Sequence, residues 1–595
     1  MKLLRNTFYI GLLTVATLNS SCRGDLMDLN PYDKVASGSM WKNEALADQG
    51  VISIYSQLRI DNNSSSSLPM SLVLESLGAS TDCRDSCYTM FFGYASGTSG
   101  MFRVFWQKNY EGVMRANDAI NNLDKAGMPD SKYKRLLAES KFLRAWFYYQ
   151  LNSVFHGVPY YTEMVSVDEL TLPRLTDGET WQRIVDDLTD CVVEVNLPDR
   201  YESGNANYGR VTKGAAYALR GKVYLWMNEW DKAEADFKKV GDVGYTLYTT
   251  GTYKSLFKEA NEQCPEMIFS MQCIGQENFG NTWGFRYGTR GILGGGGWDT
   301  FFPNTDFVDS YENADGSKFN WDDIIPGYNA MPTTTEKAVY FLRDDLSATE
   351  EESAVKNQNV DMSKYIKGGN EARIKKAYEN RDPRLTQTII TPYSNFFGTD
   401  GTNDYNYTMR WPYRGNAAPD LDLKSDQTGK FYYYYRKFVP EGLNEIPNRY
   451  YSPIDIPLIR YADVLLNRAE AINEQGFKSE AVDLVNLVRN RAGVAPLQST
   501  DPSKPTYVNS QADMRLRIQN ERRWELAGEG ITYFDELRWR TWKDVKFGNK
   551  GGVKEIWGTN SLEYNYAGDY LYNWAIPSSV VQMNPNVKQN DGWIN

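Results

Sequence analysis

The chain has 595 residues, of which 24% are charged and 41% hydrophobic, and it carries a formal net charge of −11. A chain of this size can bury a large core, and its acidic balance argues against nucleic acid or an anionic membrane surface as a partner. It has one histidine, His156, so a histidine-rich metal site is excluded. Any Ser-His or Cys-His nucleophile would have to be built on that residue, and an ordinary structural role at the end of a helix is favoured.

The N-terminus has the pattern of a lipoprotein signal peptide over residues 1–21. Two basic residues precede an apolar segment, Phe8 to Leu18, that is too short to span a bilayer. Small residues then lead to Cys22, which we expect to carry lipid and to begin a tether over residues 22–39. A plain secretory signal with an incidental cysteine is the alternative.

Helical patterns dominate two stretches of the chain, 40–240 and 440–540. In the second stretch, Asp455 to Gly493 is predicted to form two antiparallel helices with a turn at Gly476. Apolar side chains recur at i+3 and i+4 in each helix. Neither helix can bury its apolar stripe alone, so both need stacked neighbours.

A second helix pair, at residues 214–240, matches the tetratricopeptide pattern more closely. The large and small positions of that repeat are filled in order by Tyr217, Gly221, Tyr224, Trp230, Ala233 and Phe237. We therefore predict a mainly α fold with a tetratricopeptide-like α-solenoid scaffold, long irregular loops and a few short strands. The two helical stretches must combine to complete one core, so residues 40–595 are predicted to be a single compact domain.

Residues 241–440 lack a helical period, and we expect this loop-rich segment to carry the ligand site. Aromatic residues make up 14% of the chain. Three irregular regions combine them with Asp, Asn and Arg. These regions are Thr81 to Gly97, Glu277 to Phe302, and Asp404 to Asn416 together with Phe431 to Phe438. A pyranose has an apolar C–H face and a ring of hydroxyls, so a sugar site needs an aromatic platform beside polar side chains.

The predicted carbohydrate-binding residues come from the first two of these regions. They are Asp82, Arg84, Tyr88, Trp283, Tyr287, Arg290 and Trp298. They are chosen by residue type and loop context, and packing against the scaffold is the alternative for each. Burying one sugar face of roughly 40 Å² contributes about 1 kcal/mol, so several platforms are needed.

Carboxylates offer the remaining route to catalysis. Glu521, Glu525 and Glu529 recur at i+4 beside arginines. This spacing favours an ion-pair network between helices over the carboxylate pair of a glycosidase. We predict no catalytic residue and no cofactor.

Two further motifs each leave alternatives open. Tyr311 to Asp323 resembles a calcium loop, but tyrosine stands at the first ligand position, so a turn is favoured and structural calcium is the alternative. Cys83 and Cys87 either form a local disulfide or remain free thiols.

Ordered blocks along nearly the whole mature chain resemble the SusD/RagB family of outer-membrane nutrient-binding lipoproteins. The blocks are Ala138 to Tyr161, Leu172 to Leu188, Gly209 to Trp226, Tyr378 to Leu385, Asp455 to Gly493, Glu521 to Trp539 and Trp574 to Trp593. So many blocks in one order are more specific than any single motif. His156 stands where the family usually runs from Phe straight to Gly, and we expect only a local packing change there.

The resemblance implies a cell-surface protein, lipid-anchored in the outer membrane, that binds an oligosaccharide or polysaccharide without cleaving it. Such proteins serve polysaccharide utilization and nutrient uptake. The resemblance also implies a SusC-like TonB-dependent transporter as the partner, with this chain as a lid over its mouth. Two alternatives are the same lid role with peptide cargo and, less favoured, a surface glycoside hydrolase.

Overall fold

The computed structural model describes residues 37–60, 68–84, 90–290, 296–423, 430–445, 448–548 and 551–593. The predicted signal peptide at 1–21, the predicted lipidation site Cys22 and the predicted ligand contact Tyr88 lie outside these residues. Helices predominate in the described part, and its strands are short, as predicted.

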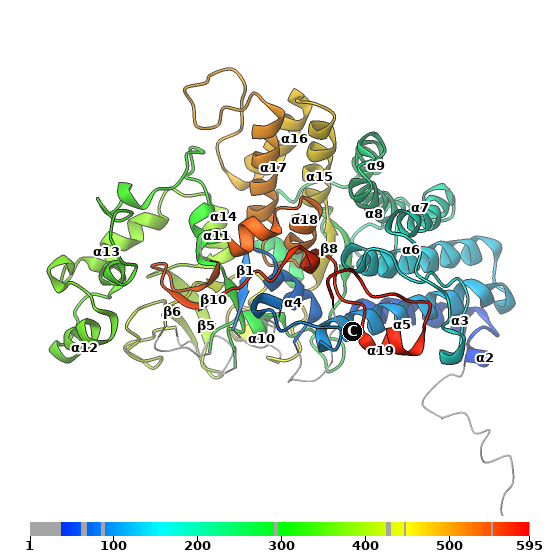
Figure 1. Cartoon of the computed structure of the whole chain (residues 1–595), viewed down its shortest axis with the longest axis horizontal. Coiled ribbons are helices and arrows are strands. Elements are labelled where there is room, and N and C mark those ends of the chain that lie inside the picture. The colour runs from blue at the N-terminus through cyan, green and yellow to red at the C-terminus, as the bar shows by residue number, and fades with distance from the viewer. Residues whose placement is uncertain are drawn as a thin grey trace, which may run out of the picture.

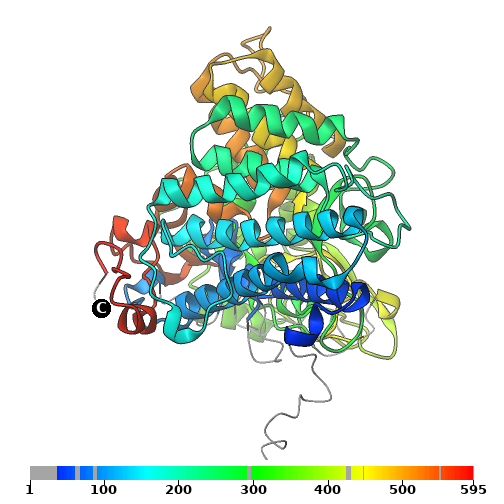
Figure 2. The same cartoon turned by 90° about the vertical axis from the view of Figure 1, so that its right-hand side faces the viewer.

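A stack of antiparallel helices forms the right-hand half of the molecule in Figure 1 and faces the viewer in Figure 2. It runs through α3 (Glu44–Tyr55), α5 (Gly100–Asn122), α6 (Asp130–Phe155), α7 (Asp177–Val193), α8 (Lys213–Trp226) and α9 (Trp230–Asp242). Each helix packs against the next, and α9 packs against a second group, α15 (Tyr461–Glu474), α16 (Ser479–Ala492) and α17 (Gln511–Leu526). The two helical stretches of the sequence therefore form one scaffold, and the predicted α-solenoid is confirmed.

The pair formed by α8 and α9 shows why the repeat pattern specifies this packing. Thr212 caps α8, because its side chain accepts a hydrogen bond from the Ala215 N–H. Gly221 faces α9, and a Cβ atom there would lie 2.6 Å from the Phe237 ring. The small position of the repeat thus lets the large position of the next helix approach closely.

His156 has the structural role expected at a helix end. It ends α6 in the left-handed conformation, with φ of 52°. Its Nδ1 atom lies 3.4 Å from the Asp177 carboxylate at the start of α7. The side chain therefore helps to join two consecutive helices.

Short antiparallel strand pairs connect the irregular segments to one another and to the scaffold. In the described residues they are β1 (Thr81–Cys83) with β3 (Phe301–Pro303), β2 (Met267–Met271) with β8 (Ile456–Arg460), β4 (Ile389–Ile390) with β7 (Tyr434–Tyr435), β5 (Asn395–Thr399) with β6 (Asp404–Thr408), and β9 (Gly552–Lys554) with β10 (Asn560–Glu563). The β2–β8 pair places Met267 opposite Arg460. Because β8 leads directly into α15, this pair fixes the irregular half against the scaffold.

Short helices complete the described part of the chain. They are α2 (Ser37–Met40), α4 (Met70–Leu77), α10 (Trp283–Tyr287), α11 (Thr305–Ser310), α12 (Ala348–Gln358), α13 (Asn370–Lys375), α14 (Arg384–Thr388), α18 (Thr532–Arg538) and α19 (Ser578–Met583). None of the helices in the described ranges is long and apolar enough to cross a membrane.

The structure resolves the two open motifs and revises one aromatic region. Tyr311 is buried and Asp315 accepts hydrogen bonds from Ser317, so the calcium-like segment contains a turn, and the described residues hold no group of three or more potential metal ligands. Cys83 is disulfide-bonded. Phe431 to Phe438, which was expected to offer platforms, is largely core: its tyrosines and both phenylalanines are buried.

A buried ion network joins the scaffold to the irregular half. Its members are Asp382, Arg384, Lys437, Arg460, Arg489, Arg491, Glu266, Glu521, Glu525 and Glu529. Arg460 donates to Glu525 at 2.6 Å and to Glu529 at 2.8 Å, and all three side chains are fully buried. The predicted network is thus present, although Glu529 follows α17 instead of lying on it.

The network keeps Glu525 ionised. Burial acts to raise the pKa of Glu525, but the guanidinium groups of Arg491, Arg460 and Arg384 outweigh it and hold that pKa well below the usual carboxyl range. A buried carboxylate of this kind depends on its partners, because desolvation alone would make its charge unfavourable.

We expect Arg460→Met to destabilise the fold by roughly 3–5 kcal/mol, because it leaves Glu525 and Glu529 with less compensation in a buried site. The control is Arg515→Met, which removes a partly exposed pair with Glu474 and should cost no more than about 1 kcal/mol. Urea denaturation measures both. Equal effects of the two substitutions would contradict the importance of the network.

Candidate functional site

Three segments distant in sequence meet around α10, at the lower edge of the molecule in Figure 1. Pairing of β1 with β3 continues into a hydrogen bond of 2.9 Å from the Arg84 N–H to the Thr300 carbonyl. On the other side of α10, Asn281 and Ser452 exchange two backbone hydrogen bonds of 3.0 and 2.8 Å. The segment that holds α10 is therefore fixed between the end of β1 and the chain that leads into β8.

Trp298 presents an exposed ring in this region. Its side chain is 40% exposed, while its backbone N–H donates to the Phe285 carbonyl of α10 at 2.9 Å. The Phe285 ring lies behind it, with ring centroids 5.7 Å apart, and the Arg290 guanidinium lies 5.3 Å from the Trp298 ring centroid. A flat apolar surface with a cation beside it is thus held on a fixed backbone.

Glycine makes that fixed backbone possible. A Cβ atom on Gly297 would lie 2.2 Å from the carbonyl oxygens of both Gly288 and Thr289. Only a residue without a side chain allows this close approach. The position of Trp298 against α10 therefore depends on the glycine at position 297.

The segment before β8 extends the surface. Tyr450 packs on Phe285 at 5.0 Å in an edge-to-face arrangement, and the Arg449 guanidinium lies 4.6 Å from the Tyr450 ring centroid. The stem of Arg449 crosses Gly296, where a Cβ atom would lie 2.2 Å from its Cδ. We call Arg290, Trp298, Phe285, Tyr450 and Arg449 the aromatic row.

The predicted site residues fall into two groups. Trp298 and Arg290 lie in the aromatic row. Arg84 lies beside the row, because its guanidinium is 3.5 Å from the carboxylate of Asp299, the residue after Trp298. Trp283 and Tyr287 are fully buried, so in this structure neither ring offers a surface to a ligand. They pack edge to face, 5.9 Å apart, and Trp283 also packs against Phe438.

Asp82 has a structural environment. It is fully buried and accepts hydrogen bonds from Lys546 at 3.1 Å, Tyr564 at 2.9 Å and Asn304 at 2.9 Å. With three donors already in place, its carboxylate fixes β1 and has no surface for a ligand.

The sequence analysis missed Arg449 and Tyr450, and also Phe279, whose ring is 57% exposed next to the chain that pairs with Ser452. The signal was available in the motif NRYYSP at 448–453, where two tyrosines follow an arginine just before a predicted helix pair. It was overlooked because it lies outside the long glycine-rich regions.

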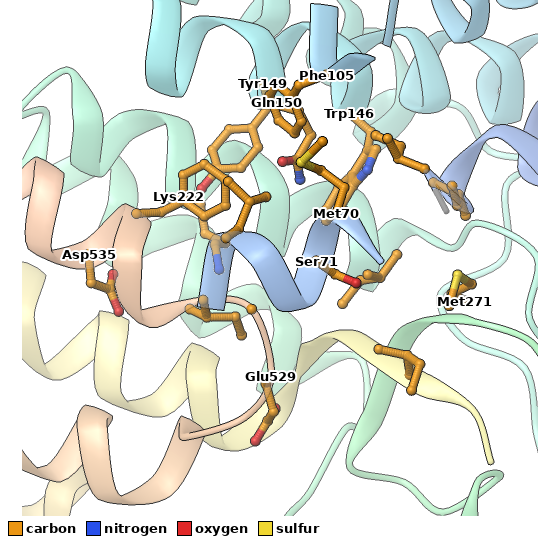
Figure 3. Close-up of a pocket in the computed structure, with 18 of the residues that line it drawn as sticks. Met70, Ser71, Phe105, Trp146, Tyr149, Gln150, Lys222, Met271, Glu529 and Asp535 are labelled. Carbon is orange, nitrogen blue, oxygen red and sulfur yellow. The ribbon is translucent and has the colours of Figure 1, made fainter. Parts of the chain in front are cut away.

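A hollow lies inside the fold, where α4, α6, α8 and α18 meet the β2–β8 pair (Figure 3). Its volume is about 90 Å³, and its walls include Met70, Phe105, Trp146, Tyr149 and Met271. A space of this size suits a few water molecules. It is too small for an oligosaccharide.

The buried carboxyl group of Asp455 and the half-buried one of Glu262 lie next to the chain that leads to Phe279. The Asp455 N–H donates to Glu262 at 2.6 Å, and the Asp455 carboxylate accepts from the Cys273 N–H at 2.6 Å. Burial, and then the charge of Asp455, raise the pKa of Glu262 above the usual carboxyl range, and burial also raises the pKa of Asp455. The folded protein therefore holds a proton here that the unfolded chain releases.

Comparisons with known proteins agree with the fold and with the resemblance. A sequence profile described as "SusD family" matches residues 265–593, and one described as "Starch-binding associating with outer membrane" matches residues 27–225. The chain is 25% identical to SusD-like protein P2 of Formosa agariphila, over 99% of each chain. It is 26% identical to the starch-binding protein SusD of Bacteroides thetaiotaomicron, over 78% of this chain and 74% of that protein.

A crystal structure of a SusD-like carbohydrate-binding protein from Bacteroides fragilis superimposes with a TM-score of 0.70. It has 22% identity and covers 92% of this chain and 100% of that one. At this identity the likeness establishes the fold alone.

The carboxyl pair predicts a dependence of stability on pH. The raised pKa values mean that the unfolded chain binds fewer protons, so this pair contributes less stability as the pH rises from 5 to 9. Glu262→Gln should therefore gain stability relative to the parent protein as the pH rises. Urea denaturation of both proteins at pH 5, 7 and 9 tests this, and parallel profiles would contradict it.

Proposed function

This chain belongs to the SusD family, and from that membership we propose that it binds an oligosaccharide or polysaccharide at the aromatic row and delivers it, uncleaved, to a SusC-like TonB-dependent outer-membrane transporter. The observation that carries the proposal is the exposed ring of Trp298, held on α10 with Arg290 beside it. The ring provides a platform for a sugar face, and the guanidinium provides donors for hydroxyls.

The row suits an extended ligand better than a single sugar. Trp298 and the half-buried Tyr450 both pack on the buried ring of Phe285, at 5.7 and 5.0 Å, and an arginine lies beside each of these two outer rings. Stacking of one sugar face contributes only about 1 kcal/mol, so binding to several successive sugars is what gives useful affinity.

Location and partner complete the proposal. Lipidation at Cys22 would place the protein at the outer membrane, in accord with the description of the profile that matches residues 27–225. The protein would then act as a lid on the transporter at the cell surface, with ligand release coupled to lid movement.

A peptide cargo is less well supported by the same geometry. Peptides commonly bind by adding a strand to a free edge. At the row, the backbone N–H groups of Trp298, Asp299 and Thr300 already donate to carbonyls of α10 and Gly288 at 2.8–2.9 Å. This stretch offers no free donors for a peptide backbone.

A glycoside hydrolase is also less well supported. Hydrolysis needs two carboxyl groups that reach the substrate. Glu521, Glu525 and Glu529 are buried in the ion network, out of reach of a polysaccharide. Beside the row, Asp299 is buried and paired with Arg84.

We expect Trp298→Ala to weaken glycan binding at least roughly fivefold, because it removes the main platform. The protein without residues 1–22 is tested by calorimetry against plant, microbial and host glycans, with a peptide mixture alongside. Leu516→Ala is the control, because this exposed leucine lies on α17, which Figure 1 shows in the upper half of the molecule, away from α10. Unchanged glycan binding by Trp298→Ala would place the site elsewhere. Binding of peptides but of no glycan would indicate that the cargo is a peptide.

We further expect no cleavage of the glycan that binds. Prolonged incubation should yield no new reducing ends, measured beside a hydrolase known to cleave the same glycan. Turnover that persists through purification to homogeneity would favour the hydrolase alternative.

A further inference from the structure

The charge of Arg449 distinguishes one end of the aromatic row. This arginine forms no ion pair with any carboxylate of the described residues; its guanidinium contacts the rings of Tyr450 at 4.6 Å and Phe285 at 5.7 Å and donates to the Tyr450 hydroxyl. Ring faces and one hydroxyl leave most of its five N–H donors without an acceptor.

Arg84, beside the row, contrasts with Arg449 because it is paired with Asp299. The chain as a whole has more acidic than basic residues, 76 against 65. The chain thus has enough carboxylates to pair with every basic residue, yet the described residues place no carboxylate beside Arg449.

Arg449 is also held in position before any ligand arrives. Its stem lies across Gly296, its head is bracketed by two rings, and the Tyr450 N–H is itself fixed by the Asn448 side chain at 2.9 Å. Ordering a free arginine on binding costs conformational entropy, and a pre-positioned one avoids most of that cost. A fixed guanidinium suits planar or tetrahedral anions, which it binds through two parallel hydrogen bonds.

We propose that the ligand is an anionic glycan, and that Arg449 binds a uronate carboxylate or a sulfate ester on a sugar next to the one stacked on Trp298. This inference rests on the proposed function, because it assigns the substrate class of the same site. Arg290, at the other end of the row, lies over Trp298 and adds positive charge along the path of the ligand.

The test compares matched glycans by calorimetry with the protein lacking residues 1–22. One arm uses polygalacturonate and its carboxyl-reduced, neutral counterpart. The other uses a sulfated galactan and its desulfated counterpart. We expect at least tenfold tighter binding of the charged member in one arm, weakening as NaCl is raised from 50 to 500 mM. The arm that responds identifies the anion.

Variants separate the charge from the platform. Arg449→Gln should lose most of the preference for the charged glycan and keep the affinity for the neutral one, and Arg449→Lys should recover part of the preference. Arg183→Gln, which removes an exposed arginine on α7, should change neither. Circular dichroism confirms that each variant is folded.

The outcomes distinguish this inference from the proposed function. Equal binding of charged and neutral glycans, with dependence on Trp298, would overturn the anionic class and leave glycan binding intact. A charge preference that survives in Arg449→Gln would overturn the role of this residue. Failure of every glycan to bind would overturn both proposals.

Discussion

The buried ion network around Arg460, where β8 meets α17, is the constraint on which the rest of this structure depends. Arg460 ends β8, and its guanidinium is bonded to acids that come from before β2 and from α17 and the chain after it. These partners are far apart in sequence, so the network forms only when the irregular half has docked on the solenoid. Its charges are unfavourable when unpaired, which makes a partly docked state costly and favours one arrangement.

The candidate site depends on the same strand. Arg449 and Tyr450 lie about a dozen residues before Arg460 of the network. Between them, Ser452 pairs with Asn281 and β8 begins at Ile456. The backbone bonds of this stretch and of α10 fix the rings of the aromatic row. An exposed binding surface can thus be built from irregular chain without being loosely held.

The sequence predicted the scaffold well, because tetratricopeptide-like spacing such as Gly221 against Phe237 is a local pattern that the helix period imposes. It predicted the site only in part. Trp283 and Trp298 stand in one glycine-rich region, yet one is fully buried and the other exposed, and this difference arises from packing against Phe438, which is distant in sequence. Arg449 was missed because its motif lies outside the long glycine-rich regions, and its contact with Phe285, which is distant in sequence, is not visible in the local pattern.

The close approach at Gly297 bears on how the specificity of such a surface can be altered. Because the backbone at this point leaves no room for a Cβ atom, the frame of the row cannot be reshaped without displacing α10. The side chains at 290, 298 and 449 project from that frame and can be exchanged separately. A library that varies these three positions and retains Gly296 and Gly297 would therefore sample new ligand preferences on an unchanged backbone, which makes this surface a practical starting point for engineered binding reagents.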